Sequence, residues 1–475
     1  MHTKKTKIVA TLGPATSTKE VLTQIIEAGV NVCRVNFSHG SYDDHEKTIN
    51  IIREISVEKK LNVAILADLQ GPKIRVGEIE NNGIFLENGK DIIFTSTKCI
   101  GNLTKVYISY QNFPKDVSQG ETILLDDGKL NLVIKSTNKK DEVVATVVHG
   151  GKLSSNKGVN LPNTKISLPC LTPKDMEDLN FALKMNVPWI GLSFVRTARD
   201  IIELKHLIAE AKSDARVVAK IEKPEAIKEI DDILKVTDAI MVARGDLGVE
   251  IPFQQVPLIQ KMLVKKSMKA GKPVIIATQM MESMIENITP TRAEVTDVAN
   301  AVLDGADAVM LSAETSVGKH PVTVIESMVK IINDVEEHES VYNYEFAPEE
   351  DNHDRYITDS ICFNACRLAQ RVNAQAIVTM TFSGYTAFKI SSFRPKAWIF
   401  VFTGNKSILN MLSLVWGVKA FYYDKYVSTD HTIADIKYIL KKEGFVNAKD
   451  LIINIASVPI SEKGQANMMK LSYIE

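Results

Sequence analysis

The chain has 475 residues, with 57 Lys and Arg against 58 Asp and Glu, and a formal net charge of -1. Apolar residues make up 45% and charged residues 24%, which is ordinary for a globular protein and excludes a disordered or fibrous chain. At roughly 100–200 residues per domain, this length predicts two to four domains. The near-neutral balance provides no overall field for nucleic acid or a membrane surface, so neither is an expected partner.

The cysteines and the apolar runs indicate the cellular setting. The five cysteines are scattered, odd in number and without metal-ligand spacing, so we expect buried thiols in a reducing, cytoplasmic environment. Cys362 and Cys366, four residues apart, are expected on one helix face. No apolar run approaches the ~20 residues that span a bilayer, and the basic N-terminal segment lacks the features of a signal peptide.

Residues 1–70 alternate strand-like and helix-like patterns, which predicts a parallel sheet. The expected strands cover 6–11, 30–37 and 63–69, and the expected helices cover 19–28 and 45–60. Residues 71–169 differ, because β-type runs follow one another, separated by turn signals and without a convincing helix. This span is therefore expected to be an inserted all-β domain.

After residue 169 the alternation returns, and this second part of the barrel is expected to extend to residue 341. The expected strands cover 189–195, 216–222, 239–244, 273–279 and 308–313. Thr291 and Glu294 form a capping box at the start of a helix that Gly305 ends. Three strands before the insertion and five after it make eight, the count of a (β/α)₈ barrel. A doubly wound open sheet is the alternative, because the pattern does not show closure.

The last part of the chain predicts a separate domain. Residues 342–354 are acidic and aperiodic, which is typical of a linker. Residues 355–475 alternate again and predict a C-terminal α/β domain with strands at 376–380, 397–402, 419–422, 451–455 and 470–473.

Polar residues stand at the ends of several expected barrel strands, where barrel enzymes gather their functional groups. Arg34, Asn36 and Ser38 alternate with apolar residues, so they share one face of the second strand. An exposed strand face is the alternative, although a barrel strand is covered on both sides. Asp68 ends the third strand, either as a cap or as a ligand.

The fifth and sixth strands carry the charges that bear most directly on chemistry. Lys220 and Glu222 lie two residues apart on one face, so they form either a buried ion pair or part of a binding site. Asp246 supplies a second carboxylate from the next strand, and Gly245 allows a close approach of the backbone to a ligand. Two hard oxygen ligands with open positions suit Mg²⁺ better than Zn²⁺.

Cations for anions, two carboxylates for a divalent metal and several hydroxyls together predict phosphoryl transfer. The residues 317–320, Val-Gly-Lys-His, lack the first Gly and the hydroxyl of a P-loop, and no Gly-x-Gly-x-x-Gly follows a strand. P-loop ATPases, protein kinases and Rossmann dehydrogenases therefore fit poorly.

A series of segments over nearly the whole chain carries a family resemblance: Thr11-Leu12-Gly13-Pro14, Arg34-Val35-Asn36-Phe37-Ser38-His39-Gly40, Gly71-Pro72-Lys73-Ile74-Arg75, Lys220-Ile221-Glu222, Met241-Val242-Ala243-Arg244-Gly245-Asp246-Leu247-Gly248, Ala277-Thr278-Gln279-Met280, Pro290-Thr291-Arg292-Ala293-Glu294 and Leu311-Ser312-Ala313-Glu314-Thr315. In this order they resemble the pyruvate kinases (EC 2.7.1.40). The resemblance implies transfer of the phosphoryl group of phosphoenolpyruvate to ADP, giving pyruvate and ATP, the last step of glycolysis.

The resemblance also implies a role for individual residues. Lys220 would stabilise charge on the phosphoryl group and the enolate, and Glu222 and Asp246 would hold Mg²⁺, with Mn²⁺ as an alternative. Thr278 would stand near the enolate carbon. The residues implied for phosphoenolpyruvate are Arg34, Ala243, Arg244, Gly245, Asp246 and Thr278. Those implied for the nucleotide are Asn36, His39, Arg75 and Lys157. The inserted domain would form a lid that carries Lys157. Arg34 and Arg75 are also implied as catalytic residues.

The monovalent-cation site departs from the pattern of many relatives. Those that need K⁺ carry Glu where this chain has Lys73, and Thr-Lys where it has Leu69-Gln70. The K⁺ shell would consist of Asn36, Ser38, Asp68 and the carbonyl of Leu69. A fixed ammonium stands in for the mobile cation, so we expect activity without K⁺.

A second site is implied in the C-terminal domain, on a loop that resembles the effector-phosphate loop of the family and would take a phosphorylated small molecule. Its residues are Thr379, Thr381, Ser383, Gly384 and Thr386. A strand-to-helix turn with capping residues is the alternative, and Tyr385 stands where many relatives have a basic residue. The resemblance further implies a homotetramer.

Two other functions remain open on the sequence. One is another Mg²⁺-dependent barrel enzyme acting on phosphoenolpyruvate or pyruvate, such as a lyase. The other is a catalytically silent regulatory homologue, which the presence of Lys220, Glu222 and Asp246 disfavours.

Overall fold

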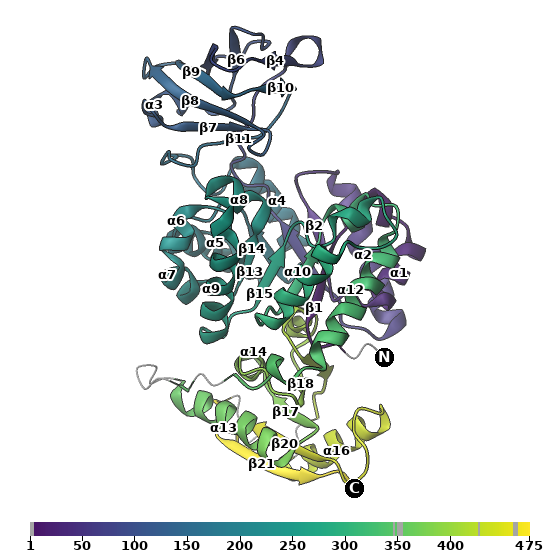
Figure 1. The fold of residues 1–475 in the computed structure, drawn as a ribbon. Coiled ribbons are helices and arrows are strands. Elements are labelled where there is room, and N and C mark those ends of the chain that lie inside the picture. The colour runs from purple at the N-terminus through teal and green to yellow at the C-terminus, as the bar shows by residue number, and fades with distance from the viewer. Residues whose placement is uncertain (1–3, 345–346, 349–354, 426–427, 459–463) are drawn as a thin grey trace.

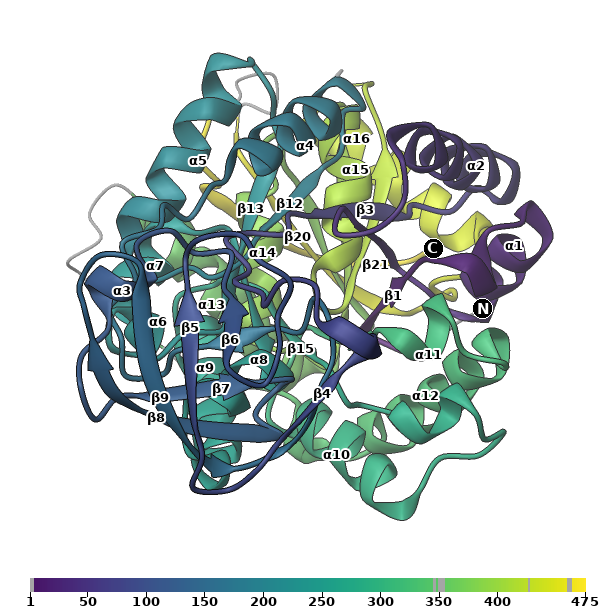
Figure 2. The same ribbon diagram turned by 90° about the horizontal axis from the view of Figure 1, so that it is seen from above.

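The computed structural model describes residues 4–344, 347–348, 355–425, 428–458 and 464–475. A β/α barrel forms the middle of the molecule, the inserted β domain lies at one end, and the C-terminal α/β domain lies at the other (Figure 1). Seen from above, the inserted domain stands over the barrel (Figure 2).

Eight parallel strands close the barrel in the order β1-β16-β15-β14-β13-β12-β3-β2. The barrel expectation is confirmed, and the open-sheet alternative is wrong. Both faces of each strand are covered, so the strands are almost continuously apolar. The strands are β1 (Lys7–Thr11), β2 (Val32–Asn36), β3 (Ala64–Asp68), β12 (Trp189–Leu192), β13 (Arg216–Ile221), β14 (Ala239–Ala243), β15 (Val274–Ala277) and β16 (Ala308–Leu311).

Helices surround the barrel and pack their apolar faces on it (Figure 2). They are α1 (Lys19–Ala28), α2 (Tyr42–Lys59), α4 (Pro173–Lys184), α5 (Ala198–Glu210), α6 (Pro224–Lys228), α7 (Ile230–Val236), α8 (Arg244–Glu250), α9 (Val256–Lys269), α10 (Arg292–Leu303), α11 (Ala313–Ser316) and α12 (Pro321–Glu336). The capping box of Thr291 and Glu294 is present at the start of α10. Helix α2 begins earlier than expected, because Ser41 and Asp44 form another capping box.

Seven of the eight barrel strands end one to three residues before their expected last residues, and in three of them the cause is local. Strand β14 stops at Ala243 because Arg244 already begins α8. Strand β12 stops at Leu192, and two residues later Phe194 has φ 54°. Strand β15 stops at Ala277 because Thr278 follows with φ 69°. These left-handed conformations turn the chain out of the sheet at the edge that carries the polar residues.

The inserted domain has one α-helix, the one-turn α3 (Phe113–Asp116), where the sequence pattern predicts none. Pro114 stands in its first turn, where a missing N–H costs no hydrogen bond. A six-stranded sheet of order β11-β7-β8-β9-β5-β6 and the pair β10-β4 enclose one apolar core. The strands are β4 (Ile84–Leu86), β5 (Asp91–Thr95), β6 (Lys105–Tyr107), β7 (Thr122–Leu125), β8 (Leu130–Thr137), β9 (Glu142–His149), β10 (Gly151–Leu153) and β11 (Val159–Asn160).

The C-terminal domain is a five-stranded sheet of order β19-β18-β17-β20-β21, in which only β21 is antiparallel to its neighbour. Its elements are α13 (Tyr356–Val372), β17 (Ala376–Met380), α14 (Tyr385–Ser392), β18 (Trp398–Thr403), α15 (Lys406–Met411), β19 (Val418–Tyr422), α16 (Thr429–Lys442), β20 (Leu451–Ala456) and β21 (Met468–Tyr473). Cys362 and Cys366 are buried on α13, and all five cysteines are free thiols. Most of the expected linker 342–354 lies outside the described residues.

Short 3₁₀ turns complete the chain at η1 (Pro14–Thr16), η2 (Glu80–Asn82), η3 (Phe253–Gln255), η4 (Glu282–Ile285), η5 (Glu339–Val341) and η6 (Leu412–Leu414). Within the described residues, no helix is both long and apolar enough to cross a bilayer.

Candidate active site

Lys220 is the hub of a buried charge cluster inside the barrel. Its ammonium lies 3.2 Å from Asp68 Oδ1 on β3 and 3.1 Å from Glu222 Oε1, which directly follows β13. It also donates a hydrogen bond of 2.7 Å to Ser193 Oγ. Burial alone lowers the pKa of Lys220, but Asp68 and Glu222 outweigh it and raise that pKa above its ordinary value. The ammonium is therefore charged.

Asp68 forms ion pairs with two cationic side chains, Arg34 and Lys220. Arg34 on β2 donates from Nε to Asp68 Oδ2 at 2.6 Å, and its Nη1 donates to Thr11 Oγ1 at 3.0 Å. The pairing of Asn36 with Asp68 in the β2–β3 register brings the two strand ends together. The Arg34 side chain is only 12% exposed, which excludes the exposed-face alternative for this residue.

Glu222 is a carboxylate with one oxygen on Lys220 and the other accepting the backbone N–H of Phe194 at 2.8 Å. Burial, with the Asp246 charge added to it, raises the pKa of Glu222 to about 6, although Lys220 acts in the opposite direction. Asp246, in the first turn of α8, is therefore close enough to Glu222 to act on it electrostatically.

The donor chemistry of Glu222 and Asp246 fits a hard divalent cation, which would offset the repulsion between them. Among the described residues no third His, Cys, Asp or Glu joins them in a metal-binding group. Two carboxylate ligands leave positions for water and substrate oxygens, as is usual for Mg²⁺.

The first turn of α8 presents backbone N–H groups beside Thr278. The Thr278 hydroxyl accepts the N–H of Gly245 at 2.8 Å and donates to the carbonyl of Ala277 at 2.6 Å. The Arg244 side chain is directed elsewhere, to Asp297 at 2.7 Å and to the Thr278 carbonyl at 2.7 Å. Any ligand at this turn therefore meets the backbone of residue 244 and not its guanidinium.

Thr278 has a left-handed backbone, with φ 69°. This conformation is strained for a β-branched residue and persists only where surrounding contacts hold it. The two hydrogen bonds of its hydroxyl are such contacts.

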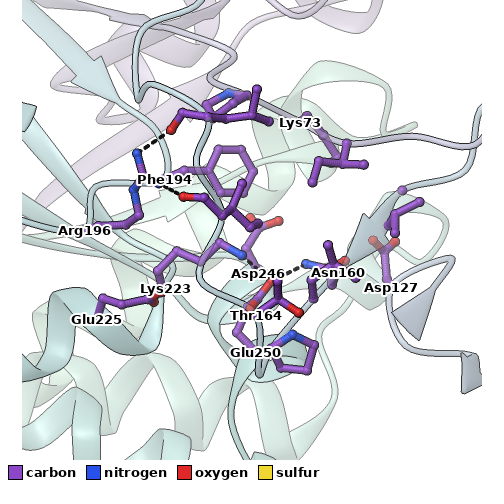
Figure 3. A pocket seen from close by; sticks show the side chains of 18 residues that line it. Lys73, Asp127, Asn160, Thr164, Phe194, Arg196, Lys223, Glu225, Asp246 and Glu250 are labelled. Carbon is purple, nitrogen blue, oxygen red and sulfur yellow. Dashed lines mark hydrogen bonds and ion pairs between the residues drawn. The ribbon is translucent and has the colours of Figure 1, made fainter. Parts of the chain in front are cut away.

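Arg75 and Lys157 lie together on the inserted domain, away from the Lys220 cluster. Arg75 donates from Nη1 to the carbonyl of Asn156 at 2.9 Å, and Lys157 pairs with Asp126 at 2.8 Å. A narrow pocket separates the two domains and is lined by Lys73, Gly158 and Asp246, among others (Figure 3). The exposed Lys73 thus belongs to this pocket, on the side of the inserted domain.

The other candidate residues near the end of β2 make short-range hydrogen bonds. Asn36 Oδ1 accepts the N–H of Ser38 at 3.1 Å, and the N–H of His39 donates to the Asn36 carbonyl at 3.3 Å. The carbonyl of Leu69 accepts the Ser193 hydroxyl at 2.6 Å. Among the described residues, no hydrogen bond or ion pair joins Lys73 to Asp68, Asn36 or Ser38.

Glu250, at the last turn of α8, links the inserted domain to the barrel. Its Oε1 accepts Asn160 Nδ2 of β11 at 2.7 Å and lies 2.7 Å from Lys223 Nζ (Figure 3). Both Glu250 and Lys223 are buried. The sequence pattern does not predict these contacts or those of Ser193 and Phe194, because a single residue after an apolar run carries no signal of its partner.

The expected effector loop uses much of its hydrogen-bonding capacity internally. Thr379 and Thr386 share a buried hydrogen bond of 2.7 Å between their hydroxyls, and Thr381 Oγ1 accepts the N–H of Gly384 at 3.1 Å. The N–H of Tyr385 donates to Ser383 Oγ at 3.4 Å. These contacts fit the capping alternative as well.

A closed (β/α)₈ barrel with a buried lysine and two electrostatically interacting carboxylates near the carboxyl ends of its strands defines a barrel enzyme suited to transfer of an anionic group. The family model "Pyruvate kinase, barrel domain" matches residues 3–325, and "Pyruvate kinase, alpha/beta domain" matches residues 359–472. The chain belongs to the pyruvate kinase family, a family of phosphotransferases.

Relatives of known sequence and structure agree with this assignment. Pyruvate kinase from Geobacillus stearothermophilus is 42% identical over 99% of this chain and 80% of its own length. The Corynebacterium glutamicum enzyme is 42% identical over 98% of this chain and 97% of its own length. The crystal structure of a pyruvate kinase from Cryptosporidium parvum matches with a TM-score of 0.91 at 35% identity, covering 99% of this chain and 96% of that one.

Proposed function

We propose that the Lys220 cluster and the first turn of α8 are where the phosphoryl group of phosphoenolpyruvate passes to ADP. The bond between phosphorus and the C2 oxygen of phosphoenolpyruvate breaks, and a bond forms between phosphorus and an oxygen of the ADP β-phosphate. The enolate that remains takes a proton at C3 and becomes pyruvate. The observation that carries this proposal is the charged Lys220 ammonium, held between Asp68 and Glu222 next to Asp246.

Glu222 and Asp246 would hold Mg²⁺, or Mn²⁺ in its place. The bound cation supplies neutralisation of the charge that spreads over the phosphoryl oxygens and the enolate. Lys220 adds a fixed positive charge at the same place, and Arg34 orients it through their shared partner Asp68.

The backbone around residues 243–245 would cradle the carboxylate of phosphoenolpyruvate, since the Arg244 side chain is already engaged by Asp297. Thr278 would hold or move the proton at the enolate carbon with its hydroxyl, which lies beside this turn and here donates to the Ala277 carbonyl at 2.6 Å. Asn36, His39 and Arg34 at the end of β2 would contact the phosphates.

Arg75 and Lys157 would reach the nucleotide when the inserted domain approaches the barrel. Here Arg75 contacts Asn156 and Lys157 contacts Asp126, both within the inserted domain. Closure of the pocket in Figure 3 would exclude water and limit hydrolysis of the phosphoryl group.

Activity without K⁺ is part of the proposal. Asp68, the charged member of the expected K⁺ shell, already has Arg34 at 2.6 Å and Lys220 at 3.2 Å. Lys73 would supply a further fixed charge from the pocket side. The effector loop at residues 379–386, a homotetramer and a cytoplasmic location complete the proposal, the last supported by five free thiols.

The test is pyruvate formation from phosphoenolpyruvate, ADP and Mg²⁺ with tetramethylammonium as the only monovalent cation. We expect turnover without K⁺, and a loss of at least about 10³-fold in Lys220→Ala because the fixed charge at the phosphoryl group is gone. Lys235→Ala, which removes an exposed lysine, should keep wild-type turnover.

Three results would contradict parts of this proposal separately. Turnover that begins only on adding K⁺ refutes the role of Lys73 and keeps the kinase. Full activity in Lys220→Ala refutes the catalytic centre. Turnover that does not depend on ADP would favour a lyase.

A further inference from the structure

The inserted domain is attached to the barrel by two connectors, and both contact the same barrel loop. Residues 69–73 lead from β3 into the inserted domain, and residues 162–172 lead from it to α4. The loop consists of residues 193–196, between β12 and α5. Its Arg196 donates hydrogen bonds to two backbone carbonyls of the second connector, each at 2.7 Å (Figure 3). The loop therefore holds the second connector against the barrel.

The first connector packs directly on this loop. Gly71 has φ 71°, and a Cβ atom at its position would lie 2.8 Å from Phe194 Cδ2 and 2.9 Å from Ser193 Cβ. Asp175, which is fully buried, accepts the N–H of Gly71 at 3.0 Å and the N–H of Thr172 at 2.8 Å. One carboxylate thus joins both connectors. Because the packing is close, a shift of Gly71 toward the loop must displace Phe194.

The same two loop residues contact the charges of the candidate active site. The Phe194 N–H donates to Glu222 Oε2 at 2.8 Å, and the Ser193 hydroxyl accepts a hydrogen bond from Lys220 Nζ at 2.7 Å. Phe194 has a left-handed backbone with φ 54°, which only surrounding contacts maintain in an aromatic residue. Two adjacent residues therefore lie between a connector of the inserted domain and the buried charges of the barrel.

The hydrogen bond from Phe194 bears on how Glu222 can bind a cation. Groups that hydrogen-bond to a metal ligand fix the orientation of that ligand. Glu222 is only 1% exposed, with Oε1 beside Lys220 and Oε2 on the Phe194 N–H. If this N–H moves, the carboxylate must turn with it or leave a buried oxygen without its donor.

We propose that Phe194 is a positioning residue through which the inserted domain controls the orientation of Glu222, and with it the affinity for the divalent cation. The inference rests on the proposed function, because it takes Glu222 as a cation ligand. It adds a route by which the position of the inserted domain reaches that ligand: Gly71 presses on Phe194, and the Phe194 N–H carries the displacement to Glu222.

The first test is Gly71→Ala, which places a methyl group against Phe194. Mn²⁺ alone is titrated into each protein, and the free ion is measured by electron paramagnetic resonance. We expect the Kd for Mn²⁺ to rise at least about tenfold, as is usual when the support of a metal ligand is disturbed. Gly89→Ala is the matched control, because Gly89 has a similar φ of 78° but no atom within 4 Å of an added Cβ; its Kd should stay within twofold of the wild type.

The outcomes separate this inference from the proposed function. Mn²⁺ binding that is equally tight in the wild type and in folded Gly71→Ala would overturn the inference alone. A wild type that does not bind Mn²⁺ would overturn the proposed cation site and the inference with it. Circular dichroism shows whether each variant is folded.

A second variant tests whether the effect passes through Phe194. Phe194→Ala removes the ring atoms nearest to Gly71 and keeps the N–H that Glu222 accepts. In the Phe194→Ala background, Gly71→Ala should raise the Kd by less than half of the factor that it causes when Phe194 is present. The same factor in both backgrounds would overturn the proposal.

A measurement on the wild type needs no variant. Coupling between two sites is reciprocal, so the bound cation must act back on the connector. Saturation with Mn²⁺ should slow hydrogen exchange in a peptide that contains residues 69–73, none of which is a proposed ligand of the divalent cation. A peptide of β8, in the inserted domain, should be unchanged. Unchanged exchange in residues 69–73 would overturn the proposal.

Discussion

At the scale of single residues, Thr278 combines backbone strain with a hydroxyl that has two partners. With φ 69° it is a β-branched residue in the left-handed region, and its hydroxyl accepts the N–H of Gly245. That N–H belongs to the turn that also carries Asp246. Thr278 therefore connects the end of β15 to the carboxylate that would hold the metal.

Thr278→Val keeps the shape of the side chain and removes the hydroxyl. We expect kcat to fall by about 10²-fold, because the proton at the enolate carbon loses its partner and the Gly245 N–H loses its acceptor. Steady-state kinetics of pyruvate formation measures this.

Two further variants serve as controls for this result. Thr278→Ser keeps the hydroxyl and should stay within a few-fold of the wild type, whereas Thr296→Val changes a threonine on the exposed side of α10 and should have no effect. A Thr278→Val enzyme with more than half of the wild-type kcat would exclude Thr278 from the chemistry.

At the scale of an element, Glu294 fixes the start of α10 to the preceding turn η4. Its carboxylate accepts hydrogen bonds from the N–H of Ser283 at 2.7 Å and of Thr291 at 2.7 Å, and from both hydroxyls. Burial acts to raise the pKa of Glu294, but these four bonds outweigh it and lower that pKa. The contact closes the loop that begins at Thr278.

Glu294→Gln tests the sign of this effect. Because the folded-state pKa is lowered, the ionised carboxylate stabilises the fold fully above pH of about 5, and this contribution is lost as the pH falls through the lowered pKa. We expect Glu294→Gln to lose about 1–2 kcal/mol at pH 7 and to approach the wild type in acid.

Urea unfolding midpoints at pH 7 and pH 4 provide the comparison. Glu326→Gln, which changes an exposed carboxylate on α12, should match the wild type at both values. A constant difference between Glu294→Gln and the wild type over the whole pH range would contradict the assignment.

At the scale of the whole molecule, Lys5 fastens the N-terminal segment to the C-terminal domain. Its ammonium donates to the carbonyls of Lys396 at 2.6 Å and Ala397 at 3.1 Å, and lies 4.7 Å from the centre of the Trp398 ring. The residue is only 4% exposed. Its backbone N–H donates to Glu336 at the end of α12, so three distant parts of the chain meet here.

Lys5→Met keeps the length of the side chain and removes its charge. Burial lowers the pKa of Lys5 to about 7, so the expected loss of about 2–4 kcal/mol comes from the carbonyls of Lys396 and Ala397, which lose their buried hydrogen-bond donor. Thermal unfolding should begin with separation of the C-terminal domain, which domain-specific hydrogen exchange detects. Lys396→Met, at an exposed lysine, serves as the control; equal midpoints for the two variants would contradict this account.

Much of the architecture is predictable because barrel strands buried on both faces are almost continuously apolar. The eight strands are predictable for this reason, and the charged pair of Lys220 and Glu222 stands out against their apolar residues. The capping box at Thr291 is predictable from its own spacing to Glu294. Arg34 and Asp68 were also visible as strand-end residues. Their mutual contact was not, since it depends on the register between β2 and β3.

The remaining features depend on tertiary contacts that leave no periodic signal. The left-handed Phe194 and Thr278 adopt conformations that their residue types disfavour, so no local rule predicts them. Ser193 and Glu250 meet partners from other strands or from another domain. The one-turn α3 is too short for a helical period to show.

Helix α8 connects the inserted domain to the barrel end that carries Asp246. Asp246 stands in its first turn and Glu250 in its last, four residues and roughly 6 Å further along the axis. Asn160 of the inserted domain donates a hydrogen bond to Glu250 at the far end of this helix. A displacement of the inserted domain would therefore act, through Asn160 and Glu250, on the same short helix that carries Asp246.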